Sequence, residues 1–195
     1  MVSGASRLAA GGMQLALLAL GIIAGAQLVG VPAGALRSAS PLGELAPWVG
    51  VALFGAGVVV HQCARRQSVG WILLVLYVAY AGQVLGGLFF GGVLSALIGA
   101  LLMTPIAVQV ASFRSGPSTL VSFLPAFWLL VPGALGLVGL TQLLGTDRAG
   151  GLQSLITTAA TMIAIAFGVL LGLGAANGIT ALTSGRQHPS QRNLG

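Results

Sequence analysis

The sequence predicts an all-α integral membrane protein, a six-helix transmembrane bundle whose fifth helix is broken by proline and glycine. Hydrophobic residues make up 56% of the 195 residues and charged residues only 5%, at a mean hydropathy of +1.02. A water-soluble domain of this size carries far more charge on its surface. Long runs without a charged residue and an uneven spread of the arginines support the same prediction.

The charge-free runs define the expected helices. The run Gln67–Phe113 would be about 70 Å long as one helix, against roughly 30 Å of hydrocarbon, so we expect it to cross twice. The sequence "GGLFFGG" at residues 86–92 is the expected turn between the two crossings. The six expected helices lie near residues 10–31, 46–63, 69–86, 90–111, 120–144 and 153–178.

Three segments are expected along the chain: an N-terminal transmembrane helix within residues 1–36, a five-helix membrane domain at 45–183 and a disordered tail at 184–195. The first segment has a second interpretation. Arg7, the apolar run from Leu15 and the small residues at 24–26 also resemble a signal peptide whose cleavage would remove residues 1–26. The topology of the remaining chain is the same in both interpretations.

All eight cationic residues are arginines, and their distribution predicts orientation. Six crossings place six arginines on one side and two on the other, which predicts a multi-pass protein with cytoplasmic N- and C-termini. If residues 120–144 dipped into the membrane and returned, the split would be five against three, so a full crossing is favoured. No solvated basic face exists, so a nucleic-acid partner is not expected. The larger group is Arg7, Arg65, Arg66, Arg114, Arg186 and Arg192, and the smaller is Arg37 and Arg148.

The expected spans lack the groups that most membrane chemistry uses. None contains Asp, Glu, Lys or Arg, so the usual charged group of a coupled transporter is missing from the hydrocarbon region. No nucleophile and base have a suggestive spacing, so we do not expect an enzyme. Cys63 is single, and His61 and His188 have no partner cluster, so neither a metal nor another cofactor is expected.

The stretch "FLPAFWLLVPGALGLVGLTQLLG" at residues 123–145 is apolar yet rich in helix-weakening residues. On a continuous helix Pro125, Trp128, Pro132 and Gly136 would share one stripe. Pro132 cannot donate a hydrogen bond, and the Pro132–Gly133 step permits a break after which the helix restarts at about residue 134. The exposed amide groups would suit a substrate carboxylate, and the unwound carbonyls would suit an ammonium group. The alternative is a proline kink that only shapes packing.

Two neighbouring helices carry further polar or helix-weakening residues. Thr104 precedes Pro105, which frees the carbonyl of Leu101, and Gln109 follows one turn later. In the last helix Thr157 and Thr161 share a face with Gly168 and Gly172. The hydroxyls would bind a small polar ligand, or would instead bond to their own backbone. The predicted substrate-binding residues are therefore Pro125, Trp128, Pro132, Gly133, Gly136, Thr104, Gln109, Thr157 and Thr161.

Small residues four positions apart predict close helix packing and leave room for a homo-oligomer. Such pairs allow backbones to approach where the lipid bilayer offers no hydrophobic drive for association. The pairs are Gly21 and Gly25, Gly82 and Gly86, and Gly168 and Gly172.

Three stretches resemble the threonine/serine exporter family, specifically its C-terminal membrane module. They are "GALLMTPIAVQVA" at 99–111, "PSTLVSFLPAFWLLVPGALGLVGLTQLLG" at 117–145 and "LITTAATMIAIAFGVLLGLG" at 155–174. The resemblance covers about residues 46–180, and Pro125, Pro132 and Gly133 are the matching positions. It implies a bacterial inner-membrane carrier that exports threonine and serine, with relatives assigned to small dicarboxylates. The family usually joins two modules, so this chain would be a C-terminal piece or would need a partner chain carrying the first module.

Three functions therefore compete at the level of sequence. The first is a transport module for small amino or carboxylic acids with its substrate near Pro125–Gly133. The second is a noncatalytic membrane scaffold or assembly subunit, whose prolines only set helix angles. A membrane enzyme ranks last, because an acid–base pair is missing.

Overall fold

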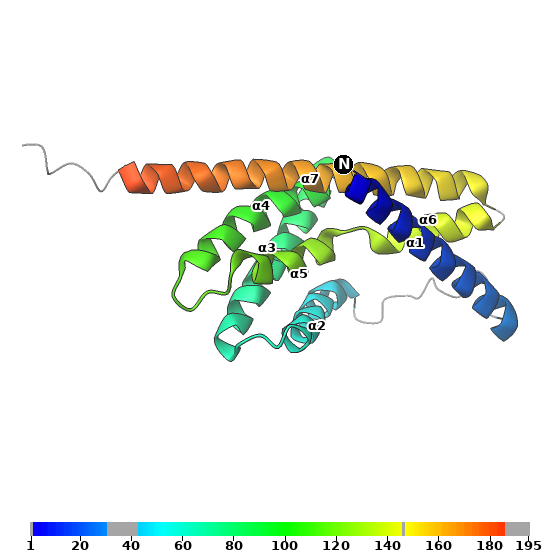
Figure 1. The fold of residues 1–195 in the computed structure, drawn as a ribbon, viewed down its shortest axis with the longest axis horizontal. Helices are drawn as coiled ribbons and strands as arrows, with labels where there is room; N and C mark the ends of the chain where they lie inside the picture. Colours follow the sequence, from blue (N-terminus) through cyan, green and yellow to red (C-terminus); the bar gives the residue numbers. More distant parts are fainter. Residues whose placement is uncertain (1, 31–42, 146, 186–195) are drawn as a thin grey trace, which may run out of the picture. The chain divides into compact units, whose positions relative to one another are not determined.

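The computed structural model describes residues 2–30, 43–145 and 147–185. All regular secondary structure in these ranges is helical, which confirms the all-α prediction (Figure 1). The elements are α1 (Val2–Val29), the short 3-10 helix η1 (Gly43–Leu45), α2 (Ala46–His61), α3 (Arg66–Phe90), α4 (Gly92–Ser112), α5 (Thr119–Leu130), α6 (Gly133–Leu144) and α7 (Arg148–Gly185).

Five helical segments in the described ranges are long and apolar enough to cross a membrane. Thr119–Leu144, which joins α5 and α6, counts as one of them. The sixth expected span corresponds to α2, which has only 16 residues. At the rise of an α-helix this is about 24 Å, shorter than the hydrocarbon layer. The other four segments are Gly4–Val29, Arg66–Phe90, Gly92–Ser112 and Arg148–Gly178.

The chain forms two compact units, and α7 contributes to each of them. The larger unit contains Leu42–Val131 and Thr161–Gly195, and the smaller contains Met1–Pro41 and Pro132–Ala160. The expected division into 1–36, 45–183 and 184–195 stays a prediction. Most of the expected tail, residues 186–195, lies outside the described residues.

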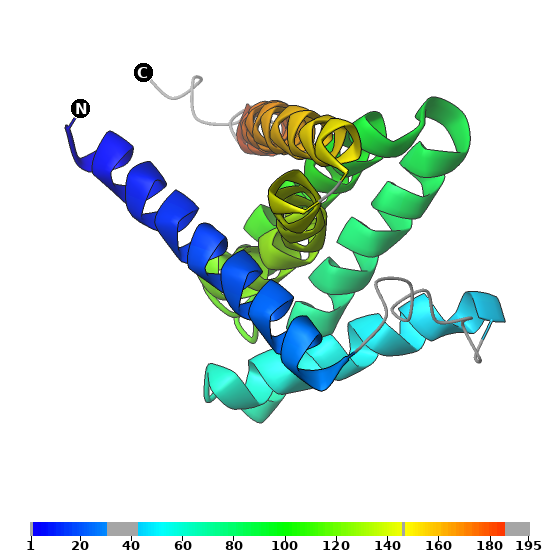
Figure 2. The same ribbon diagram turned by 90° about the vertical axis from the view of Figure 1, so that its right-hand side faces the viewer.

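The core of the larger unit lies where α3, α4 and α5 pack side by side (Figures 1 and 2). α3 contributes both large aliphatic residues and small ones to this core, and most of the buried residues of α4 are small, so the two helices approach closely. α2 packs on the outer side of α3, where the Tyr77 hydroxyl donates a hydrogen bond to the Trp48 carbonyl over 3.1 Å. The fully buried core residues include Ile72, Val75, Leu76, Ala79, Ala96, Ala100, Met103 and Ala126.

The turn between α3 and α4 is tighter than expected. α3 continues to Phe90, and the chain reverses at Gly91, whose φ of +84° favours glycine. Gly86, where the expected turn began, is therefore not a turn residue, whereas Gly91 lies within the expected turn. A Cβ on Gly82 would lie 3.0 Å from the Gly99 Cα, and one on Gly86 would lie 2.7 Å from the Ser95 Cα. Their role is the close helix approach predicted from their spacing.

The second half of α7 belongs to the larger unit and packs on α4. A Cβ on Gly168 would lie 2.8 Å from the Ala100 Cβ, and one on Gly172 would lie 2.7 Å from the Thr104 Cβ. Gly168 and Gly172 thus allow the close helix packing predicted from their spacing, and this contact lies within one chain. By contrast, Gly21 and Gly25 on α1 have no atom within 4 Å of an added Cβ in the described structure.

In the smaller unit, α6 packs against α1 and against the first half of α7. A Cβ on Gly139 would lie 2.9 Å from the Ser154 Cβ, so the backbone of α6 closely approaches α7. The Ser154 hydroxyl donates a hydrogen bond to Gln142 Oε1 over 3.3 Å. Glycine on α6 therefore serves helix packing as well as weakening the helix.

Candidate functional site

The expected break in the fifth helix is present. α5 continues through Pro125 and ends at Leu130, Val131 is extended with a ψ of 123°, and α6 begins at Gly133. α6 therefore begins one residue before the expected restart at about residue 134. Pro132 has no N–H group to donate, so the Trp128 carbonyl loses its usual helical partner. The predicted stripe assumed one continuous helix, and the break removes that assumption.

The start of α6 has the features of an anion-binding helix end. The Gly136 amide donates to the Pro132 carbonyl over 3.0 Å, and no side chain caps the helix. The preceding amides, those of Gly133 to Leu135, therefore have no acceptor within the helix. Gly133 is exposed, and an added Cβ there would meet no atom within 4 Å. Free amides at an exposed helix start favour a carboxylate or another anion.

The predicted substrate-binding residues are distributed over both compact units. Pro125 is buried, whereas Trp128, one turn later, is 45% exposed. In the smaller unit, the Thr158 methyl group would lie 3.4 Å from a Cβ on Gly136. Thr104, Gln109, Pro125, Trp128 and Thr161 belong to the larger unit, and Pro132, Gly133, Gly136 and Thr157 belong to the smaller.

Contacts within the chain account for the Thr104 hydroxyl and for the carbonyl that Pro105 frees on α4. The Thr104 hydroxyl is buried and donates to the Ala100 carbonyl over 2.7 Å. The Leu101 carbonyl, which Pro105 deprives of its helical partner, is covered by α7, because a Cβ on Gly172 would lie only 2.9 Å from this oxygen. Gln109 is exposed. The Leu101 carbonyl, which lacks its helical partner because of Pro105, is thus covered by protein.

The hydroxyls of α7 also turn toward their own backbone. Thr157 donates to the Gln153 carbonyl over 2.9 Å, and Thr158 donates to the Ser154 carbonyl over 2.8 Å. Thr161 is buried. The alternative in which membrane threonines bond within their own helix is confirmed for Thr104 and Thr157.

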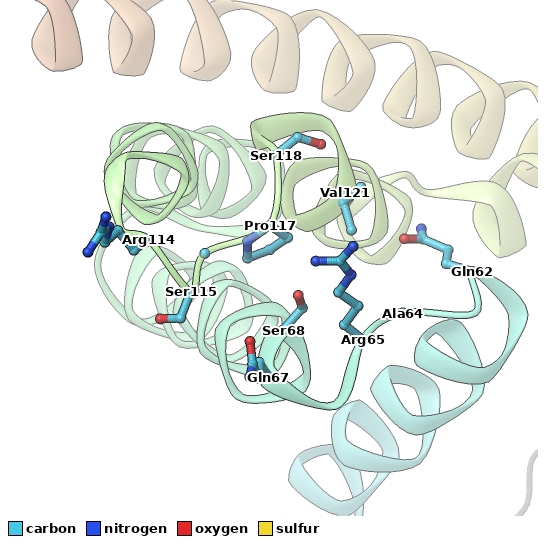
Figure 3. A pocket seen from close by; sticks show the side chains of 11 residues that line it. Gln62, Ala64, Arg65, Gln67, Ser68, Arg114, Ser115, Pro117, Ser118 and Val121 are labelled. Carbon is cyan, nitrogen blue, oxygen red and sulfur yellow. The ribbon is translucent and has the colours of Figure 1, made fainter.

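A pocket that the sequence analysis missed lies in the larger unit, between the α2–α3 and α4–α5 connections (Figure 3). Its volume is about 320 Å³. All 11 lining residues are described, and none of them is acidic. Its polar lining residues are Gln62, Arg65, Gln67, Ser68, Arg114, Ser115 and Ser118.

Aromatic contacts hold one wall of this pocket in place. Trp71 on α3 stacks on Phe113 with ring centroids 5.1 Å apart, and its Nε1 donates to the Ser115 hydroxyl over 3.3 Å. Gly116 lies so close to the Val110 carbonyl that an added Cβ would overlap it. The connection between α4 and α5 is thereby fixed against the start of α3.

The sequence held a weak signal for the pocket. The stretch "RRQS" at 65–68 places an arginine and a serine at the start of α3. The stretch "RSGPS" at 114–118 places Arg114 just after α4 and Ser118 at the start of α5. The predicted topology also places both on the same side. What the sequence did not show is that the two connections meet in space. Among the described residues, no group of three or more His, Cys, Asp or Glu side chains gathers, and the absence of a cofactor stays a prediction.

Comparison with protein-family models, with curated proteins and with solved structures finds no match to this chain. The resemblance to the threonine/serine exporter family therefore rests on the three quoted stretches alone.

Proposed function

We propose that the chain is a multi-pass membrane protein and a transport module for small amino acids such as threonine and serine, or for small dicarboxylates. The observation that carries this proposal is the interruption at Val131–Pro132 inside an apolar segment of 26 residues, Thr119–Leu144. Unpaired backbone groups are costly in hydrocarbon unless protein, water or a ligand satisfies them. Interrupted helices at membrane depth are typical of transporter substrate sites.

The start of α6 supplies the most suitable groups for a substrate carboxylate. Its free amides and the positive end of its dipole lie at Gly133–Leu135, and no side chain competes for them. Gly136 lies in the first turn of the same helix. We propose that this helix start holds the solute carboxylate without any buried charge, and the roles of Pro125 and Trp128, which belong to the larger unit, stay predictions.

A partner chain fits the proposed transport role. The apolar spans carry no charged residue in their interior, so an ion-coupling group would have to come from elsewhere. A partner carrying the first module of a split carrier would supply it. In this proposal both chains lie in the bacterial inner membrane.

Efflux measurement tests the proposal. Cells that express this chain with a candidate first-module partner are expected to release labelled threonine, serine or succinate faster than cells that express either chain alone. Immunoblotting of membrane fractions controls for insertion. Absence of flux in both arrangements, with the chain present in the membrane, would contradict the transport role.

A noncatalytic scaffold is the second candidate, and the packing of α4 favours it. Thr104 bonds within its own helix, and Gly172 covers the carbonyl freed by Pro105. Two features that supported a substrate site thus have a structural explanation. Enlarging Gly168 or Gly172 would not identify a scaffold, because both glycines pack on α4 of the same chain. A scaffold instead predicts no solute flux with any partner.

Cys63 provides a direct test of the proposed orientation. It is the single cysteine of the sequence, is exposed and lies between α2 and α3, on the side proposed to be cytoplasmic. A membrane-impermeant maleimide is expected to label it in inside-out vesicles and not in intact spheroplasts.

The matched control for this labelling is Ala149→Cys in a Cys63→Ser background. Ala149 is exposed at the start of α7, on the side proposed to be outside. It should show the opposite labelling pattern. Labelling of Cys63 from outside intact spheroplasts would contradict the orientation.

A further inference from the structure

We propose that the pocket between the α2–α3 and α4–α5 connections binds a phosphate group. The group would be the head group of an anionic phospholipid or a free phosphate anion. This inference goes beyond the proposed transport function, because it concerns another region of the chain and does not require solute movement. Its evidence lies entirely within the larger unit.

The first observation is Ser68, a polar side chain on the first turn of α3. It is only 8% exposed, and Figure 3 shows its hydroxyl pointing into the pocket. No side-chain hydrogen bond of Ser68 lies within the described part of the chain. No described side-chain oxygen is both fully buried and without a partner, so the Ser68 hydroxyl is accessible from the pocket. It is therefore available to donate a hydrogen bond to a ligand bound there.

The second observation is the convergence of two helix starts. Arg65 is the N-terminal cap residue of α3, which has 25 residues, and Ser118 is that of α5, which has 12. Neither helix has a side-chain cap hydrogen bond, and both cap residues line the pocket. Two sets of free amides and two positive dipole ends therefore lie at one cavity.

The third observation is charge. Figure 3 shows the Arg65 guanidinium extending over the pocket toward Val121, with the Gln62 amide facing it from the other side. Arg114 also lines the pocket, but its guanidinium points away from the other lining side chains in Figure 3. No acidic residue lines the pocket to neutralise them. A guanidinium with nearby hydroxyl, amide and backbone donors matches the several oxygens of a phosphate better than the two of a carboxylate.

Binding measurements with the purified full chain in neutral detergent test the proposal and separate the two sources. Native mass spectrometry would measure binding of phosphatidylglycerol, with phosphatidylcholine as the zwitterionic comparison. Calorimetry would measure binding of inorganic phosphate. We expect Arg65→Gln to weaken binding of the preferred ligand about tenfold, as the loss of a charge-assisted hydrogen bond predicts. Ser68→Ala should weaken it roughly threefold or more.

Arg66→Gln is the matched control. Arg66 is adjacent in sequence and exposed, and it does not line the pocket. Its loss should change affinity by less than about twofold, as expected for a surface charge. Circular dichroism of each variant shows whether the helices are retained, and Arg114→Gln repeats the test from the other connection.

The two probes and the two arginine variants distinguish a lipid site, a soluble phosphate site and no site. Saturable binding of phosphatidylglycerol that depends on Arg65 but not on Arg66 supports a lipid head group. Arg65-dependent binding of inorganic phosphate supports a soluble phosphate. Equal effects of Arg65→Gln and Arg66→Gln, or no binding of either probe, would overturn the proposal, because the arginines would then act only as general surface charge.

Discussion

Replacing Gly99 with leucine is expected to lower the free energy of unfolding by about 3 kcal/mol. Gly99 lies on α4 where this helix meets α3 and α5. A Cβ there would lie 2.8 Å from the Ala79 carbonyl oxygen and 2.8 Å from Leu130 Cδ2. Leu130 can change rotamer, but the Ala79 oxygen belongs to the backbone of α3 and can move only with the helix. Thermal unfolding in detergent, followed by circular dichroism, measures the effect.

Gly70→Leu is the matched control for this experiment. Gly70 lies on α3, is exposed, and has no atom within 4 Å of an added Cβ. The same substitution there should not lower stability, and the removal of a glycine from a helix should raise it by about 0.5–1 kcal/mol. Equal stability of the two variants would show that α3 and α4 do not pack at the distance described. Gly99→Ala should give an intermediate loss, because its single methyl already meets the Ala79 oxygen.

The parts of the fold that follow from composition and length were predictable from the sequence. The charge-free run Gln67–Phe113 is too long for one crossing, and its division into α3 and α4 is present. The break at Pro132 was predictable because this proline is followed directly by glycine, whereas the helices continue through Pro105 and Pro125. Such covalent and length constraints do not depend on tertiary contacts.

The role of each glycine was harder to predict, because a turn glycine and a packing glycine have the same local signature. In "GGLFFGG" the first pair was read as part of the turn, yet Gly86 lies inside α3 and packs against Ser95. Within this stretch only Gly91 has the positive φ of a reversal. The distinction comes from the neighbouring helix, which the local pattern does not contain.

The candidate site shows the same dependence on tertiary contacts. Pro105 predicts a free Leu101 carbonyl, but the sequence does not reveal that Gly172, far along the chain, covers it. The pocket at Arg65 was missed for a related reason. Its walls come from two connections that are joined through Trp71 and Ser115, 44 residues apart in the chain. The helix break was found because its cause is local.

Removing the helix break is expected to reduce transport strongly while leaving the chain folded. Pro132→Ala restores a backbone N–H, and alanine allows α5 and α6 to join into one helix. The free amides at the start of α6 would then bond within the helix and would no longer be available to a substrate carboxylate. We expect efflux of the transported solute to fall about tenfold or more, as the loss of hydrogen bonds to a charged group predicts. Initial rates of labelled efflux, normalised to the amount of chain in the membrane, measure this.

Gly133→Leu separates loss of the site from loss of the fold. Gly133 is exposed and an added Cβ meets no atom within 4 Å, so leucine fits there without disturbing the described packing. Its side chain would nevertheless stand beside the free amides and hinder a ligand. We expect normal insertion and unchanged thermal unfolding with strongly reduced efflux. Gly57→Leu, on the exposed face of α2 and equally free of neighbours, is the control and should transport normally. Full efflux from both Pro132→Ala and Gly133→Leu would mean that the break only shapes packing, and the substrate site would have to lie elsewhere.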